Sequence, residues 1–164
     1  LEELVRDTDV IAFANSGNTD PGTYPHIRGE WIKPGALIIG VSCFELDAGY
    51  MADTEKCRLV VDNTALYEAW AEEFPYPSFG ANNIIGSKFT DMIHDGFIEK
   101  SDMYDLGDII NSKCAGRDSD QQVVIFSVGG MPVEDVAWGK RCYEKAMELG
   151  LGQKLRLWEK PDLA

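Results

Sequence analysis

The stretch "VVIFSVGGMPVED" at residues 123–135 decides the fold class of this chain. An apolar run ends at Ser127, a turn with paired glycines follows, and a long helical pattern then begins at Pro132. Proline at the first helical position, followed by acidic residues, is typical of a helix N-terminus. The stretch therefore predicts a buried strand, a bare turn and a helix. Two explanations of the bare turn stay open, a tight strand–helix corner or a close approach of the backbone to a ligand.

Apolar runs of the same kind recur along the chain and alternate with helical patterns. Strands are expected at residues 10–15, 36–42, 57–63 and 122–127. These runs are continuous rather than alternating, which is typical of parallel strands whose two sheet faces are both covered. Helical patterns occupy residues 45–56, 64–74, 82–98, 103–113 and 132–150. The alternation predicts an α/β fold with right-handed crossovers.

Several residues mark the ends of these predicted elements. Asn63 or Thr64 is expected to cap the helix at 64–74, and Gly150 is expected to end the long last helix. The segment "FPYPSFG" at residues 74–80 is expected to be a surface loop, because its prolines and glycine disfavour regular structure.

Length and charge limit the class of protein. A chain of 164 residues and 18.2 kDa is large enough for one domain with a hydrophobic core. Its formal net charge of −13 repels phosphate backbones, so nucleic-acid binding is not expected. A dinucleotide is still compatible with this charge, because helix N-termini and backbone N–H groups hold phosphates without basic side chains. No apolar run predicts a signal peptide or a membrane span.

The cysteine and histidine pattern favours neither a metal site nor a catalytic triad. The 4 cysteines, at positions 43, 57, 114 and 142, form no CxxC pair and have no histidine cluster beside them. This favours reduced, mostly buried thiols of a cytoplasmic protein over disulfides or a metal site. His94 lies in a helical stretch and is interpreted as a surface or hydrogen-bonded histidine rather than a base.

Small and polar residues follow the predicted strands, where open α/β sheets bind their ligands. They are Asn15, Ser16, Gly17, Asn18, Ser42, Cys43, Phe44, Asp62, Asn63, Ser127, Val128, Gly129 and Gly130. The set predicts a groove for a flat or extended ligand, although Asp62 is equally explained as a helix cap. Neither GxGxxG nor GxxxxGK[ST] occurs, so the usual phosphate-binding turn is not in this chain.

Taken together, the segments resemble those of the ornithine cyclodeaminase/mu-crystallin family. The stretches that carry the resemblance are "DTDVIAFANS" (7–16), "GEWIKPGALIIGVS" (29–42), "FELDAGYM" (44–51), "CRLVVDN" (57–63), "HDGFI" (94–98) and the whole of residues 105–152. They follow the family's order and spacing over nearly the whole chain. The "EW-KPGA" and "F-SVG-VED" turns are the most specific of them.

This resemblance implies a Rossmann-like parallel sheet with flanking helices that binds NAD or NADP. The implied activity is that of an oxidoreductase, which transfers hydride at the nitrogen-bearing carbon of an amino acid or a cyclic imine. Members of the family are usually homodimers, so the resemblance implies a homodimer. The alternative is a mu-crystallin-like module that binds nucleotides or small molecules without catalysis.

The resemblance covers only the C-terminal half of the family's chain. Residues 1–130 then correspond to the second half of a doubly wound NAD(P)-binding domain. Residues 131–164 correspond to a C-terminal helix and tail that pack on an N-terminal substrate and dimerisation domain. Because the family's pyrophosphate loop and substrate-binding residues lie upstream, no catalytic residue is assigned here. The first residue is Leu1, so we expect a fragment, completed by its missing half or by a second chain.

The family's cofactor-binding positions match a small set of residues in this chain. Asn15 and Ser16 match the turn beside the nicotinamide ribose, and Gly40, Val41 and Ser42 match the strand end under the nicotinamide. Ser127, Val128 and Gly129 match the turn that closes the nicotinamide and substrate pocket, which explains the bare turn by the approach of a ring.

The chain departs from the cyclodeaminases in the loop that follows its second predicted strand. Those enzymes carry a substrate-binding Asp there, whereas this loop is short and has no Asp before Glu45. An imine reductase or amino-acid dehydrogenase is therefore at least as well supported as a cyclodeaminase. Phe44, in the same loop, is interpreted as a residue that narrows the pocket or favours an apolar substrate.

Overall fold

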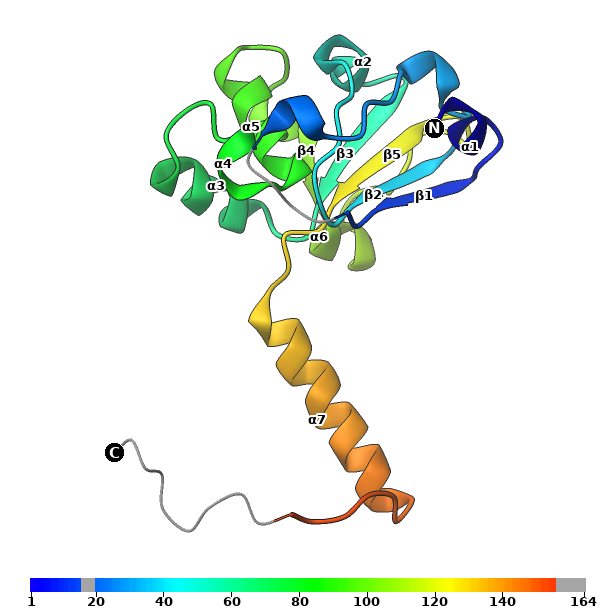
Figure 1. The fold of residues 1–164 in the computed structure, drawn as a ribbon, viewed down its shortest axis with the longest axis vertical. Coiled ribbons are helices and arrows are strands. Elements are labelled where there is room, and N and C mark those ends of the chain that lie inside the picture. Colours follow the sequence, from blue (N-terminus) through cyan, green and yellow to red (C-terminus); the bar gives the residue numbers. More distant parts are fainter. Residues whose placement is uncertain (16–19, 156–164) are drawn as a thin grey trace. The chain divides into compact units, whose positions relative to one another are not determined.

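The computed structural model describes residues 1–15 and 20–155. A 5-stranded, all-parallel sheet forms its centre, with the strand order β1-β2-β5-β3-β4 (Figure 1). The strands are β1 (Val10–Phe13), β2 (Leu37–Gly40), β3 (Cys57–Val61), β4 (Met103–Asp105) and β5 (Val123–Ser127). The predicted α/β class and parallel sheet are confirmed.

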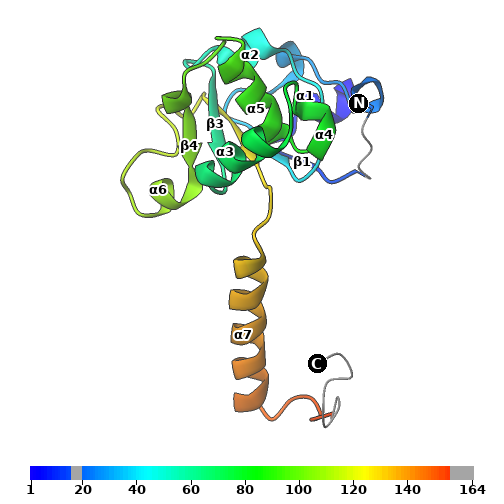
Figure 2. The same cartoon turned by 90° about the vertical axis from the view of Figure 1, so that its left-hand side faces the viewer.

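Short helices connect and cover the strands. They are α1 (Glu2–Arg6), α2 (Ala48–Ala52), α3 (Thr64–Glu73), α4 (Phe79–Asn82), α5 (Ile85–His94) and α6 (Leu106–Ile110), with 3₁₀ turns at Pro21–Thr23, Gly29–Trp31 and Lys100–Asp102. Figure 2 shows α3 and α5 side by side over one face of the sheet. Asn63 caps α3 as predicted, because its side chain accepts a hydrogen bond from the Leu66 N–H.

The chain divides into two compact units, Leu1–Gly129 and Gly130–Ala164. The described part of the second unit is a helix, α7 (Pro132–Glu148), in which no residue is buried. Pro132 lies in its first turn, as predicted, and Gly150 stands one residue beyond the cap residue Leu149. Gly150 has a φ of +65°, the left-handed conformation that glycine adopts most readily at the end of a helix.

Three predicted helices are shorter than their patterns suggested. The pattern at residues 45–56 is helical only in α2. The pattern at residues 103–113 begins as the strand β4, whose Met103 pairs with Leu59, and only α6 is helical. A strand of 3 residues is too short to show a period, so the sequence pattern could not reveal it. The pattern at residues 82–98 is helical only in α5, because Asn83 adopts a left-handed φ of +55° between α4 and α5.

Candidate functional site

The carboxyl ends of the strands form one continuous edge. The register aligns Phe13 with Gly40, Gly40 with Ser127, and Ser127 with Val61, which in turn aligns with Asp105. Because all the strands are parallel, the residues that follow these positions emerge on the same side of the sheet. The structure thus brings Gly40 and Ser127, two of the predicted site residues, to neighbouring positions at the centre of the edge.

Asn15 and Ser42 join the loops that follow β1 and β2. The Ser42 hydroxyl donates to the Asn15 side-chain oxygen at 2.6 Å, and the Asn15 backbone N–H donates to the Ser42 Oγ at 3.1 Å. This reciprocal pair holds a hydroxyl and an amide at the carboxyl edge. Ser16, Gly17 and Asn18 lie outside the described residues.

Ser127 ends β5 and is fully buried, with 0% of its surface exposed. Its Oγ accepts a hydrogen bond from the Gly86 N–H at 2.9 Å and lies 2.9 Å from the Tyr67 hydroxyl oxygen. The residue therefore anchors α3 and α5 to the end of the central strand, and its own side chain does not face solvent.

Val41, Val128 and Gly129 contribute accessible surface to this edge. Val41 is 51% exposed, unusual for a valine directly after a central strand, whereas Val128 and Gly129 are half-buried. The Val128 N–H donates to the Gly40 carbonyl oxygen at 2.9 Å, so the turn after β5 lies against the end of β2. These residues offer a small apolar surface next to the Asn15–Ser42 pair.

The glycines at this edge are explained by contacts within the protein. A methyl carbon on Gly40 would lie 2.5 Å from the Ile85 Cγ2, and one on Gly129 would lie 3.0 Å from both Trp70 and the Tyr67 hydroxyl. Gly130 has open space around it and a φ of +79°, so its role is conformational. These contacts supply the structural explanation of the bare turn, and the approach of a cofactor ring stays a prediction.

The structure corrects the interpretation of Phe44 and shows the surroundings of Cys43, both in the loop after β2. Phe44 is fully buried and stacks on Phe13 with ring centroids 4.4 Å apart, so the interpretation that it narrows a pocket is wrong. The ring fills the space under the short loop instead. Burial raises the pKa of the neighbouring Cys43 thiol to about 12, so this thiol is not a nucleophile at neutral pH.

Asp62 and Asn63, which follow β3, serve mainly to start α3. The Asp62 carboxylate accepts a hydrogen bond from the Asn63 N–H at 3.1 Å. Asp105, at the end of β4, accepts from the Thr64 N–H at 3.1 Å and the Gly107 N–H at 2.8 Å, and so supports the starts of both α3 and α6. Sequence patterns did not single out Asp105, because its segment was predicted to be helical.

A concavity of about 450 Å³ lies at the opposite, amino ends of β3 and β5. Its central charge is Arg58, whose side chain is only 4% exposed. The guanidinium pairs with Asp118 at 2.5 Å, donates to the Ala115 carbonyl at 2.7 Å and lies over the Tyr104 ring at 4.0 Å. These bonds fix the segment between α6 and β5 to the sheet. A structural role therefore explains why the charged side chain of Arg58 is buried here.

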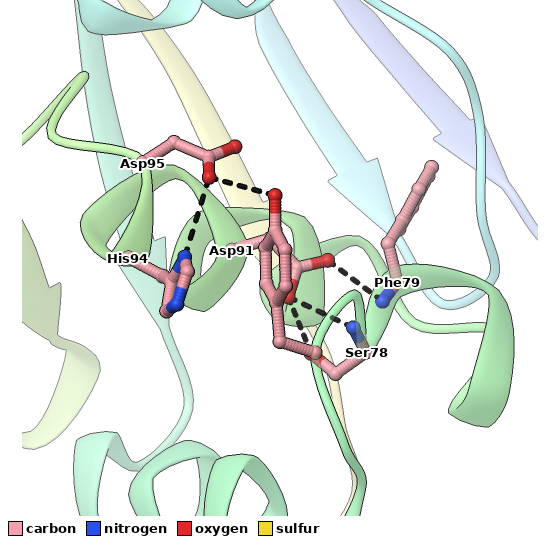
Figure 3. A network of polar contacts seen from close by, with 6 residues as sticks. Ser78, Phe79, Asp91, His94 and Asp95 are labelled. Carbon is pink, nitrogen blue, oxygen red and sulfur yellow. Dashed lines mark hydrogen bonds and ion pairs between the residues drawn. The ribbon is translucent and has the colours of Figure 1, made fainter.

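The loop at residues 75–78 is held by a network on α5 (Figure 3). The Asp91 carboxylate accepts hydrogen bonds from the Ser78 N–H, the Ser78 hydroxyl and the Phe79 N–H, each at 2.9 Å. Ser78 and Phe79 are buried, so the second half of the predicted surface loop is in fact anchored in the fold. Asp91 explains this, since its carboxylate satisfies the donors that enter α4.

At the exposed end of the same network, Asp95 accepts a hydrogen bond from the Tyr76 hydroxyl at 2.7 Å. The His94 ring stacks on Tyr76, with centroids 3.9 Å apart, and its Nδ1 lies 3.3 Å from the Asp95 carboxylate. The hydrogen bond from Tyr76, followed by that from His94, lowers the pKa of Asp95. The surface position predicted for His94 is confirmed, since its side chain is largely exposed.

Replacing Tyr76 with phenylalanine is expected to raise the pKa of Asp95 toward its ordinary value. The stabilising effect of a carboxyl group with a lowered folded-state pKa is present above its unfolded pKa and lost as the pH falls through the folded pKa. The variant should therefore lose less stability on acidification than the wild-type protein does. An NMR pH titration of the Asp95 carboxyl carbon checks this, and an unchanged pKa in Tyr76→Phe would contradict the assignment.

The cysteines differ in exposure. Cys43 and Cys57 are buried, Cys114 is half-buried, and all 4 are free. Cys142, in α7, is exposed, so the expectation of mostly buried thiols does not hold for it. Within residues 1–15 and 20–155, no group of acidic, histidine and cysteine side chains has the arrangement of a metal site. No helix in the described part of the chain is long and apolar enough to cross a membrane.

The sheet and its carboxyl edge define an open α/β domain of the class that binds ligands beyond the ends of parallel strands. The chain belongs to the ornithine cyclodeaminase/mu-crystallin family, whose family model matches residues 1–150. The resemblance inferred from the sequence is thereby confirmed.

Individual proteins similar to this chain carry the names of a reductase and a dehydrogenase. It is 39% identical over 159 residues to a Delta(1)-pyrroline-2-carboxylate reductase of Bacillus cereus (strain ATCC 10987), covering 93% of this chain and 42% of that protein. It is 27% identical over 146 residues to an alanine dehydrogenase of Archaeoglobus fulgidus, covering 85% of this chain and 39% of that protein.

A solved structure agrees with the sequence comparison. The structure of Thermococcus litoralis Delta(1)-pyrroline-2-carboxylate reductase in complex with NADH and L-proline matches with a TM-score of 0.61 and 25% identity. The match covers 94% of this chain and 42% of that one. The chain therefore spans less than half the length of the relatives it matches.

Proposed function

We propose that this chain forms the nicotinamide side of an NAD- or NADP-dependent oxidoreductase that acts on an amino acid or a cyclic imine. The reaction is hydride transfer at a nitrogen-bearing carbon. The observation that carries the proposal is the carboxyl edge around Gly40 and Ser127, in a chain of this family. Support comes from relatives named as reductases and dehydrogenases, one of them solved with NADH and L-proline.

The residues at the edge suit the nicotinamide end of the cofactor. Val41 presents an exposed apolar side chain at the centre of the edge, which suits the flat face of a ring. The Asn15–Ser42 pair supplies amide and hydroxyl groups for a ribose or a carboxamide. When bound, the nicotinamide supplies or accepts the hydride. Around it, Ser127 would keep the turn of Val128 and Gly129 in place beside the ring.

The cofactor's pyrophosphate and the substrate would be held by polypeptide that completes this unit. β1 pairs only with β2 among the described strands, and its Val10 is 55% exposed. An unpaired parallel edge with exposed apolar residues is a place where further strands add. We propose that the first half of the doubly wound sheet pairs with β1, either as a longer chain or as a second one.

The helix α7 supports the same proposal independently. Its large apolar side chains are exposed, namely Val133, Val136, Trp138, Tyr143 and Met147. Exposed apolar surface of this extent marks an interaction site. We propose that it packs on a substrate and dimerisation domain and that the complete protein is a homodimer.

A cofactor titration followed by an activity assay tests the proposed function. The protein, in its complete natural assembly, is expected to change the fluorescence of NADH or NADPH saturably. It should then oxidise the reduced cofactor when given a cyclic imino acid, or a 2-oxo acid with ammonia. Absence of any saturable fluorescence change with both cofactors would overturn the proposal.

The main alternative, a binding module without catalysis, predicts saturable cofactor binding but no hydride transfer to any imine. It is not favoured, because the relatives reported above carry the names of catalytically active enzymes. Among the enzymes, cyclodeamination of ornithine has less support than imine reduction, since the loop after β2 has no Asp before Glu45. Proline formation from ornithine, assayed beside imine reduction, separates these two activities.

A further inference from the structure

Tyr67 joins three elements beneath the carboxyl edge. It comes from α3, is 1% exposed, and places its hydroxyl oxygen 2.9 Å from the Oγ of Ser127 at the end of β5. The same Oγ accepts the Gly86 N–H from the first turn of α5. One phenol thus links α3 to the end of the central strand, and through Ser127 to α5.

The ring of Tyr67 also fixes the path of the turn that follows β5. A methyl carbon on Gly129 would lie 3.0 Å from the Tyr67 hydroxyl and 3.0 Å from the Trp70 ring. Trp70 in turn packs edge-on against Tyr67, with centroids 5.3 Å apart. The backbone at Gly129 therefore lies directly on these two aromatic side chains of α3, which leave no room for a side chain there.

The hydroxyl acts as a neutral hydrogen-bonding group. Burial raises the pKa of Tyr67, and the nearby Asp62 carboxylate raises it further, although hydrogen bonds with Ser127 and the Gly129 backbone N–H oppose this. The phenol thus stays protonated throughout the neutral range and is not suited to act as a base. Its bonds to Ser127 and Gly129 make it a support for the turn.

We propose that Tyr67 is a positioning residue, which holds the Ser127–Gly129 turn in the place where it contacts the nicotinamide end of the cofactor. The inference rests on the proposed function, because only a bound cofactor would make the position of this turn matter for activity. Tyr67 itself touches neither cofactor nor substrate in this account. It acts through the hydroxyl of Ser127 and the backbone of Gly129.

The test is Tyr67→Phe in the complete natural assembly, with NADH and NADPH as probes. Loss of the buried hydroxyl and its hydrogen bonds should weaken cofactor affinity about fivefold to tenfold, while kcat at saturating cofactor falls less than about twofold. Ser127→Ala should weaken affinity similarly. The loss of affinity in the double variant should be less than the sum of the two single losses, because both changes break the Tyr67–Ser127 link.

Tyr50→Phe is the matched control. The Tyr50 hydroxyl is bonded to Cys57 at the amino end of β3, so the variant removes a comparable hydroxyl at the opposite end of the sheet. It should leave cofactor affinity unchanged, whatever it does to thermal stability. Additive effects of Tyr67→Phe and Ser127→Ala, or equal losses of affinity in Tyr50→Phe and Tyr67→Phe, would overturn the inference.

The outcome also separates this inference from the proposed function. Wild-type protein that binds neither cofactor overturns the proposed function. Wild-type protein that binds, together with a Tyr67→Phe variant of unchanged affinity, overturns the positioning role alone. If Tyr67→Phe fails to fold, Ser127→Ala provides the same comparison of affinity against kcat.

Discussion

Replacing Gly86 with alanine should lower the free energy of unfolding by about 3 kcal/mol, the upper end of the usual cost of overpacking a core. The added methyl carbon would lie 2.0 Å from the Cε1 of Tyr67 and 2.7 Å from two further ring carbons. That ring is fully buried and wedged between α3 and the turn after β5, so it has no space in which to move away. The clash also disturbs the hydrogen bond from the Gly86 N–H to Ser127. Chemical denaturation monitored by circular dichroism measures the effect.

Gly139→Ala is the matched control, because it makes the same change inside another helix. Gly139 lies in α7, and apart from its two chain neighbours no side chain of that helix lies within 4 Å of the position that its methyl carbon would take. Alanine is the better helix former by about 1 kcal/mol, so this variant should be as stable as the wild-type protein or slightly more so. Equal stability of Gly86→Ala and Gly139→Ala would contradict the packing of Tyr67 described here.

Replacing Asp91 with alanine should also destabilise the fold, by about 2–4 kcal/mol, because hydrogen bonds to a charged acceptor contribute about 1.5–3 kcal/mol each and some donors will find water. The change leaves the Ser78 N–H, the Ser78 hydroxyl and the Phe79 N–H without their acceptor (Figure 3). Ser78 and Phe79 are buried, so water replaces the carboxylate only if the start of α4 moves outward. Thermal and chemical unfolding of the variant measure the loss.

Asp95→Ala provides the comparison, because it removes an aspartate from the exposed end of the same network. Its hydrogen-bond partners, Tyr76 and His94, lie at the surface and are solvated without it. Its stability should stay close to that of the wild-type protein. A loss in Asp95→Ala as large as that in Asp91→Ala would show that the loop before α4 is not held as the structure indicates.

The class of the fold was predictable because the buried strands appear in the sequence as continuous apolar runs. Such runs are typical of parallel sheets whose two faces are both covered by helices. The sequence pattern missed β4, since Met103–Asp105 is too short to carry a period. It also placed the strands in chain order only. The insertion of β5 between β2 and β3 depends on long-range pairing that no local pattern reports.

The candidate site was predictable in outline because strand ends are recognisable and lie together in a parallel sheet. The support beneath it was not. Leu66 and Trp70 are four residues apart, which is the spacing of a helix face, and this pattern drew attention away from Tyr67. Yet Tyr67 is the only residue of α3 that is buried. Phe44 was misread for a related reason, since a large apolar residue in a short loop gives no local sign of whether it points into a pocket or into the core.

The measurement that tests the central claim most directly is native mass spectrometry of the protein as isolated from its own cells, with denatured masses recorded beside it. The account predicts an assembly that contains more polypeptide than these 164 residues, as a longer chain or a second one, together with a bound nicotinamide dinucleotide. The chain found alone, monomeric and without a dinucleotide would contradict it, because the edge strand β1 would then stay unpaired and no cofactor would meet the carboxyl edge.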